Sequence, residues 1–391
     1  MHRVSCAFFV RCLYVIYLDN AATTGQKPQC VINAVNNALR YYSANPGRSG
    51  HDLSIKTATE IYKCRQAVKE IIGASSENNV CFTLNCTHAI NTVLHGVLRR
   101  GDHLIISSLE HNAVWRPANY LQKEKGIQFD IAQVDLKDDN TTLKNINTLI
   151  KPNTRLIFVT AASNVVGKKL PINMIGELCF ERGILFGVDA AQAAGMSPID
   201  MQKSHIDFLC IAPHKGFYAP MGTGILVAEK RIDNILISGG TGVNSLEALQ
   251  PEEMPERIES GTVNVVGIAG IKAGIDFIRS KGIKNIEKYE MKLVRYFFKK
   301  LEKIGAILYT ALPCETGFAP VVSFNMKGFS SEEIGEYLNR KGIAVRTGIH
   351  CSPLAHKQLG TTNIGTVRVA PSVFNTADDM DRLIFYLKRL I

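Results

Sequence analysis

The sequence predicts an α/β protein with a mainly parallel sheet. Short apolar runs alternate with amphipathic helical runs through the first two thirds of the chain, a pattern typical of parallel sheets. The composition is 46% hydrophobic and 20% charged over 391 residues, which excludes a disordered chain, a collagen-like repeat and a coiled coil. No apolar run reaches the ~18 residues that a membrane helix needs, so we expect no membrane partner.

Seven apolar runs are expected to form the strands of this sheet, namely 80–84, 103–107, 127–134, 155–160, 184–188, 208–212 and 224–228. Helical patterns such as 88–98 and 172–181 fill most of the gaps between them. No G-x-G-x-x-G follows the first strands, which excludes a dinucleotide-binding fingerprint.

The rhythm of the sequence changes near residue 265. The stretch 265–304 predicts two helices that break at Gly282. An α+β pattern follows, with strands at 321–325, 343–346 and 366–369 and helices at 331–340 and 377–390. We therefore predict a large domain over 15–264 and a small C-terminal domain over 265–391. The N-terminal segment is expected to pack on the small domain.

The N-terminal stretch 7–18 is apolar but contains Arg11 and lacks a small-residue cleavage site. We expect no signal peptide and a cytoplasmic protein; alternatively, the natural chain starts near Val15. The ten cysteines are irregularly spaced and include no CxxC pair. This spacing excludes zinc ribbons and thioredoxin motifs, and we expect no metal site and mostly buried, reduced thiols.

The net charge of +10 favours anionic ligands, either nucleic acid or phosphorylated small molecules. The basic residues are scattered, however, and the nearest cluster, Lys299, Lys300 and Lys303, has the spacing of a solvated helix face. We therefore expect no nucleic-acid partner.

Two strand ends carry residues of complementary chemistry. Asp189 follows the run 184–188 and can hold a positive charge on a ligand, because ligands bind at the carboxyl ends of strands. A helix N-cap is the alternative for Asp189. Lys215 follows the run 208–212 and can form a Schiff base. Pyridoxal phosphate needs such a lysine and an acidic partner for its ring nitrogen.

Other polar residues follow the remaining strands. Thr87 opens a helix after the run 80–84, where a phosphate can bind, although a plain N-cap would look the same. His111 follows the run 103–107 and can stack on a planar ring, and Asn164 lies beyond the run 155–160 at the same edge.

Several motifs together resemble the cysteine desulfurase branch of the class V aminotransferase family. They are YLDNAATT over 17–24, RSGH over 48–51, SNVVG over 163–167, VDAAQ over 188–192, His214-Lys215, ESGT over 259–262 and VRTGIHC over 345–351. The resemblance runs from about residue 15 to the end and is strongest to the short-loop, selenocysteine lyase-like enzymes. It implies a PLP-dependent transferase fold of the aspartate aminotransferase type, with a large domain of about seven strands and a small domain, and it implies a homodimer.

The resemblance also implies a role for each matching residue. Lys215 would carry pyridoxal 5'-phosphate, Asp189 would pair with the ring nitrogen, and His111 would stack on the ring. Gln192 and Asn164 would form hydrogen bonds on the side of the cofactor ring that carries its oxygen. The phosphate would be held by Thr87, the backbone of Cys86, His214 and, from the other subunit, Thr262.

Cys351 stands apart from the other cysteines because its loop, 346–353, carries glycine, proline and nearby cations, which favour a thiolate. By resemblance it would attack the sulfur of the substrate. Arg368 and Arg346 are candidates for the substrate carboxylate, with a surface arginine as the alternative for Arg346. Asn164 would contact the substrate too. His51 would line the entrance, or else be structural.

These expectations define a PLP-dependent cysteine desulfurase. It would convert L-cysteine to L-alanine, keep the sulfur as an enzyme persulfide and pass it to an acceptor protein. The alternatives are a selenocysteine lyase acting on L-selenocysteine, another class V aminotransferase or β-lyase, and, from a different class, a non-catalytic anion- or nucleic-acid-binding protein. The presence of both Lys215 and Asp189 argues against the last.

Overall fold

The computed structural model describes residues 15–46, 50–314 and 316–390. The expectations about residues 1–14, Arg48 and two of the cysteines, Cys6 and Cys12, lie outside these ranges. Within the ranges, no helix is long and apolar enough to cross a membrane.

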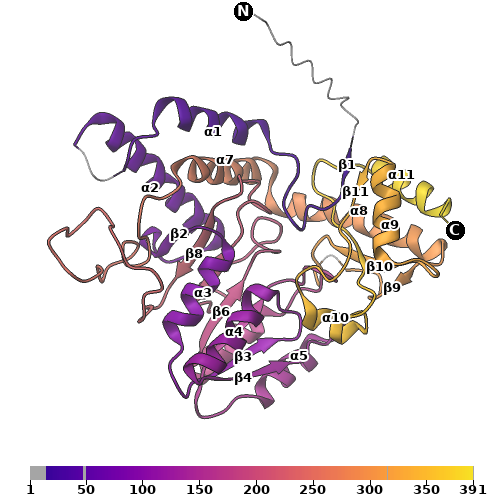
Figure 1. Cartoon of the computed structure of the whole chain (residues 1–391), viewed down its shortest axis with the longest axis horizontal. Helices are drawn as coiled ribbons and strands as arrows, with labels where there is room; N and C mark the ends of the chain where they lie inside the picture. Colours follow the sequence, from indigo (N-terminus) through magenta and orange to yellow (C-terminus); the bar gives the residue numbers. More distant parts are fainter. Residues whose placement is uncertain (1–14, 47–49, 315, 391) are drawn as a thin grey trace, which may run out of the picture.

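A seven-stranded sheet forms the centre of the larger part of the molecule, with strand order β2-β8-β7-β6-β5-β3-β4 (Figure 1). Strand β8 runs opposite to the other six strands. The strands are β2 (Val80–Thr83), β3 (His103–Ser107), β4 (Gln128–Ala132), β5 (Thr154–Thr160), β6 (Leu185–Asp189), β7 (Phe208–Ile211) and β8 (Gly224–Ala228). All seven predicted strands are present, and the predicted α/β class with a mainly parallel sheet is confirmed.

Helices cover both faces of this sheet, and successive strand residues alternate between the two faces. One face meets α3 (Cys86–Val97) and α4 (Asn112–Lys125), and Leu104 and Ile106 of β3 point there. Ile105 points to the opposite core, which includes α2 (Asp52–Ile72), α5 (Asp139–Thr148) and α6 (Ile172–Arg182). The strands other than β4 are therefore mostly buried on both sides, which explains their apolar runs, whereas the edge strand β4 is only partly buried.

A smaller unit holds the C-terminal part of the chain. It has a sheet of order β12-β10-β9 and a parallel pair of β1 with β11. Its elements are β1 (Ile16–Tyr17), α8 (Ile283–Lys303), β9 (Ile307–Leu308), β10 (Val322–Asn325), α9 (Ser331–Arg340), β11 (Ile343–Ala344), β12 (Val367–Val369) and α11 (Ala377–Lys388). Helix α10 (Pro353–Leu359) lies between β11 and β12 in the chain, but its buried apolar residues belong to the cores of the large sheet. Ile16 and Leu18 are buried in the core of the smaller unit, so the N-terminal segment packs there (Figure 1).

The helix that follows residue 264 packs with the large sheet. Helix α7 (Val265–Lys281) lies beside α1 (Gln29–Tyr41) and α2, and its buried isoleucines, Ile268, Ile271, Ile275 and Ile278, belong to the core on the α2 face. The domain division near residue 265 stays a prediction. This packing supports a later division, and we propose that it falls within α8, whose Met291 is already part of the smaller core.

Gly216, next to Lys215, marks a close approach of two backbone segments. A Cβ at this position would lie 2.1 Å from the carbonyl oxygen of Ala194. We expect Gly216→Ala to lower the free energy of unfolding by about 1–3 kcal/mol, measured by urea denaturation. Gly239→Ala is the matched control, because its nearest neighbour, the Ser260 Cβ, is 3.7 Å away. Equal stability of the two variants would contradict the packing described.

Candidate active site

The carboxyl ends of the parallel strands surround a cavity of about 230 Å³. Asp189 is the last residue of β6, and Lys215 follows β7 by a short loop. All of the predicted cofactor residues except Thr262 line this cavity, namely Cys86, Thr87, His111, Asn164, Asp189, Gln192, His214 and Lys215. The structure thus brings together residues that are up to 129 positions apart in the sequence, from Cys86 to Lys215.

Lys215 and Asp189 form the electrostatic centre of this cavity. Burial lowers the pKa of Lys215 below its ordinary value, and the negative charge of Asp189 opposes that shift. Asp189 is 4% exposed, and its Oδ1 accepts a hydrogen bond from the backbone N–H of Ala191 at 2.9 Å and from the Cys86 thiol at 3.6 Å. The pair offers an amine that is easily deprotonated and a carboxylate fixed to face a positive charge.

Unpartnered polar atoms show that the cavity suits a polar planar ligand. Gln192 Oε1 and His214 Nδ1 are buried and have no partner among the described residues, and buried polar groups ordinarily have one. Gln192 Nε2 donates to the carbonyl of Ala21 at 2.7 Å, which fixes the amide. These atoms, together with Lys215 and Asp189, fit pyridoxal phosphate.

The first turn of α3 is where the sequence predicts the phosphate site. Asn85 caps this helix by accepting from the backbone N–H of His88 at 2.8 Å. Cys86 and Thr87, at the start of the helix, line the cavity, where N-terminal N–H groups favour an anion. Burial, with the charges of Lys215 and Lys27, lowers the pKa of His214 to about 4. The imidazole is therefore neutral at pH 7 and can donate one hydrogen bond.

Lys27 is a residue of this region that the sequence did not single out. Its Nζ donates to the carbonyl of His214 at 3.0 Å and to the Thr24 hydroxyl at 2.9 Å, and burial lowers its pKa to about 8. The Thr24 hydroxyl donates in turn to the carbonyls of His214 and Lys215. Lys27 lies just beyond the YLDNAATT motif, which was the only signal for it.

His111 joins the cavity to the cysteine loop. It caps α4, and its Nδ1 accepts from the backbone N–H of Ala113 at 3.0 Å, so Nε2 carries the proton and remains available. Burial lowers the pKa of His111. A second cleft, of about 430 Å³, is lined by His111, Thr87 and Cys351. The predicted sulfur nucleophile therefore lies next to the cavity, with His111 and Thr87 between the two.

The loop that carries Cys351 is attached to the large unit at several points. Asn112 N–H donates to the carbonyl of Cys351 at 2.7 Å. Asn164 Nδ2 donates to the carbonyl of His350 at 2.7 Å, and the Ser352 hydroxyl donates to Asn164 Oδ1 at 2.6 Å. His350 and Cys351 both have positive φ, 51° and 57°, a conformation rare outside glycine. These contacts fix the backbone that carries the exposed thiol.

The other thiols differ from Cys351 in their surroundings. Cys64, Cys81, Cys179 and Cys210 are buried, and burial raises the pKa of each. Cys30 and Cys314 are exposed but line neither the cavity nor the cleft. Among the described cysteines, Cys351 combines exposure with a position beside the cavity.

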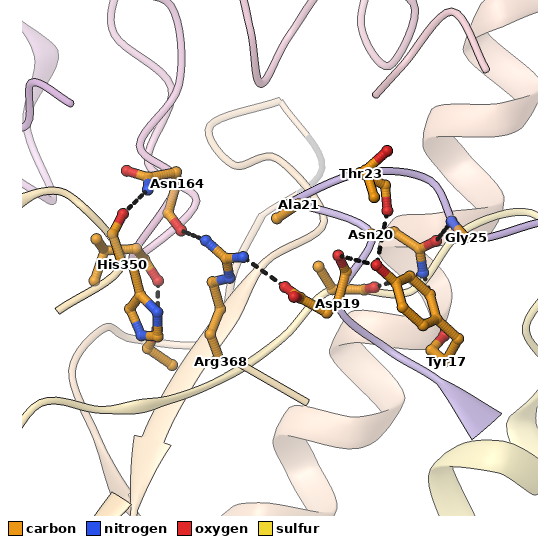
Figure 2. A network of polar contacts seen from close by, with 12 residues as sticks. Tyr17, Asp19, Asn20, Ala21, Thr23, Gly25, Asn164, His350 and Arg368 are labelled. Carbon is orange, nitrogen blue, oxygen red and sulfur yellow. Dashed lines mark hydrogen bonds and ion pairs between the residues drawn. The ribbon is translucent and has the colours of Figure 1, made fainter. Parts of the chain in front are cut away.

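The predicted substrate arginines differ in burial. Arg368, on β12, is 3% exposed and contacts Asp19 and the carbonyl of Asn164, as Figure 2 shows. Arg368 is not among the residues that line the cavity, but it contacts Asn164, which is. The side chain of Arg346 is exposed, and its backbone pairs with that of Arg368. Their roles with a substrate carboxylate stay predictions.

His51 and Thr262 are not part of the cavity in this chain. His51 is exposed and caps α2, with its Nδ1 accepting from Ser54 N–H at 3.2 Å, and its role at the substrate entrance stays a prediction. Thr262 is also exposed. Glu259, from the same motif, forms a two-pronged ion pair with Arg65, at 2.8 and 2.6 Å. The Arg65 guanidinium also donates to the carbonyl of Val80, at the start of β2. The ion pair therefore attaches Glu259, and with it the segment before Thr262, to the edge of the sheet.

Glu110 is a buried carboxyl that the sequence analysis did not assign. Its Oε1 accepts from the hydroxyl of Ser107 and from the backbone N–H of Thr160, which ties the ends of β3 and β5 together. Its Oε2 is buried without a partner in the described part of the chain. Burial raises the pKa of Glu110 to about 8. It is therefore mostly protonated at pH 7, directly before His111.

The fold and this site define a pyridoxal-phosphate enzyme of the aminotransferase type. A sequence model of the family described as aminotransferase class-V matches residues 16–383. Proteins named "Probable cysteine desulfurase" are 33% identical in Xylella fastidiosa, with 96% of this chain and 91% of that protein covered, and 32% identical in Pyrococcus abyssi, with 96% and 94% covered.

Solved structures agree with these sequence relatives. The apo structure of the cysteine desulfurase from Thermococcus onnurineus has a TM-score of 0.89 and 31% identity, covering 97% of this chain and 95% of that one. A cysteine desulfurase from Escherichia coli has a TM-score of 0.86 and 25% identity, covering 96% and 94%. The chain belongs to the cysteine desulfurase family of class V aminotransferases. Its predicted fold type is thereby confirmed, and the non-catalytic binding protein is ruled out.

The raised pKa of Glu110 makes a testable prediction about pH. The folded state holds this proton up to about pH 8, whereas an unfolded glutamate releases it near its ordinary value, so stability from this group is lost as pH rises between the two. Glu110→Gln removes that dependence. We expect its stability relative to the wild type to increase by about 1–3 kcal/mol from pH 5 to pH 8, measured by urea denaturation. A difference that is constant with pH would contradict the assignment.

Proposed function

We propose that this protein is a PLP-dependent cysteine desulfurase that converts L-cysteine to L-alanine and leaves the sulfur on Cys351 as a persulfide. The observation that carries the proposal is the placement of an exposed thiol, on a loop whose backbone is fixed by hydrogen bonds, beside a cavity that Lys215 and Asp189 line. The family membership supports the same reaction.

Pyridoxal phosphate bound through Lys215 supplies an electron sink that weakens bonds at the α-carbon of the substrate. Asp189 holds positive charge at the ring nitrogen and so keeps that sink effective. The Lys215 amine, with its lowered pKa, can accept the α-proton. His111, neutral because burial lowers its pKa, can hold a proton at Nε2 facing the reacting atoms.

The sulfur transfer follows from the position of Cys351. Its thiolate forms an S–S bond with the substrate sulfur while the Cβ–S bond breaks, and the bonding electrons stay with the carbon skeleton. That skeleton takes up a proton and leaves as L-alanine, so the sum is L-cysteine plus enzyme thiol giving L-alanine plus enzyme persulfide. The open cleft of about 430 Å³ at Cys351 leaves room for an acceptor protein to take the sulfur.

A homodimer is part of the proposal. Thr262 and His51 are exposed and away from the cavity of their own chain, which suits residues that serve the site of a second copy. The segment 234–251 also exposes Leu246 and Leu249 almost completely, as expected for side chains that a partner covers. We further propose a cytoplasmic protein, since all the described cysteines are free thiols.

The proposal is tested by separating cofactor binding from sulfur transfer. We expect Cys351→Ala to keep the visible absorption band of the bound cofactor and to lose at least 100-fold in L-alanine production, because the remaining groups do not supply a nucleophilic sulfur. Lys215→Ala should lose the activity and shift the band. Both follow from absorption spectra and an alanine assay with L-cysteine.

Cys30→Ala and Cys314→Ala are matched controls, because both thiols are exposed but lie outside the cleft. Both variants should keep wild-type activity. Full alanine production by Cys351→Ala would overturn the proposed role of that thiol and would favour an aminotransferase or β-lyase, which need no cysteine nucleophile.

A further inference from the structure

We infer that Asp19 is a positioning residue for substrate recognition, because its carboxylate fixes the guanidinium of Arg368, the residue predicted to take the α-carboxylate of the substrate. The inference rests on the proposed function and deepens it. Asp19 lines neither the cavity nor the cleft. It would therefore act on the substrate through Arg368.

The contacts of Arg368 leave part of its guanidinium for a ligand. Nη2 donates to Asp19 Oδ1 at 2.7 Å and Nη1 donates to the carbonyl of Asn164 at 3.0 Å. Nε is buried and has no partner in the described part of the chain. A guanidinium has five N–H donors in one plane, so these two bonds fix the plane and keep other donors free for a second carboxylate.

The backbone around Asp19 is held before any ligand binds. Leu18 N–H donates to Ala344 and its carbonyl accepts from Ala370, at 2.9 and 2.8 Å. The Tyr17 hydroxyl donates to the Asp19 carbonyl at 3.2 Å, as drawn in Figure 2. The Asp19 side chain is 15% exposed. Its carboxylate therefore has a fixed position from which to orient the arginine.

The charge of Asp19 is also the counter-charge of a buried cation. Burial lowers the pKa of Arg368, as does the neighbouring charge of Arg346, and Asp19 opposes both effects. Within the described chain, Asp19 is the acid that forms an ion pair with Arg368. An arginine without that partner would be free to turn toward other acceptors, and its plane would no longer be set.

The same arginine is linked to the nucleophile through one residue. Asn164 accepts from Arg368 with its carbonyl, while its side-chain amide bonds to both sides of Cys351, at His350 and Ser352. Figure 2 shows Asp19, Arg368, Asn164 and His350 as one continuous chain of contacts. The orientation set by Asp19 therefore places the carboxylate site at a defined position relative to the thiol.

The test compares two amines that differ only in the carboxylate, L-alanine and ethylamine. Their dissociation constants for the holoenzyme are measured from the change in the visible absorption spectrum. We expect Asp19→Ala to raise the dissociation constant of L-alanine at least tenfold and to change that of ethylamine by less than twofold. Asp19→Asn keeps an oxygen acceptor for Arg368 and should weaken L-alanine less.

Two controls separate positioning from a general loss of structure. Asp139→Asn removes the charge of another aspartate that pairs with a buried cation, since Asp139 lies 2.7 Å from the Lys168 amine. This variant should leave the dissociation constants of both amines unchanged. In an Arg368→Ala background, replacing Asp19 should have no further effect on L-alanine.

The inference is overturned if the Asp19 variants weaken the binding of both amines equally, or weaken the binding of neither. Should Asp19→Ala not fold, Asp19→Asn decides by the same criterion, the ratio of the two dissociation constants. A wild-type enzyme that binds L-alanine but produces none from L-cysteine would refute the proposed function alone. The selectivity of the Asp19 variants would still decide the inference.

Discussion

The site depends on one constraint, the attachment of residues 16–27 to both parts of the molecule. On one side, β1 pairs with β11, and Leu18 bonds across to Ala370. On the other side, Thr23, Thr24 and Lys27 donate to the carbonyl of His214, next to the lysine that would carry the cofactor. The segment fixes the cofactor loop and the C-terminal unit relative to each other.

This attachment explains how a site made from distant parts of the chain reaches a defined geometry. The large sheet alone places Asp189 and Lys215, because both follow neighbouring strands. The thiol and Arg368, the predicted carboxylate-binding residue, come from the smaller unit, and contacts with Asn164, Asn112 and the N-terminal segment hold them beside the cavity. Catalysis by positioning requires that the reacting groups be held together in this way.

The sequence predicted the sheet well because the burial of a strand is visible in the apolar character of its own residues. Six of the seven strands are buried along most or all of their length, so they appear as apolar runs of the right length, whereas the edge strand β4 is only partly buried. The sequence analysis did not single out helices α1 and α2, and it placed α7 at the start of the small domain without knowing which core its buried side joins. Which core an amphipathic helix joins is decided by tertiary packing.

The candidate site could be predicted where a residue follows a strand or sits in a motif, as for Lys215, Asp189 and Cys351. Lys27, Glu110 and the part played by Asp19 were missed, since their importance comes from partners far away in sequence, such as Arg368. Thr262 and His51 show the opposite case. They belong to recognisable motifs, but the cavity of their own chain does not include them.

The central claim is that Cys351 receives the sulfur, and one measurement tests it most directly. The holoenzyme is mixed with one equivalent of L-cysteine in the absence of a reductant, digested, and its cysteine peptides are analysed by mass spectrometry. The account predicts the added mass of one sulfur atom on the peptide that contains Cys351, together with one equivalent of L-alanine. L-alanine formed with the extra sulfur on another cysteine, or on none, would contradict it.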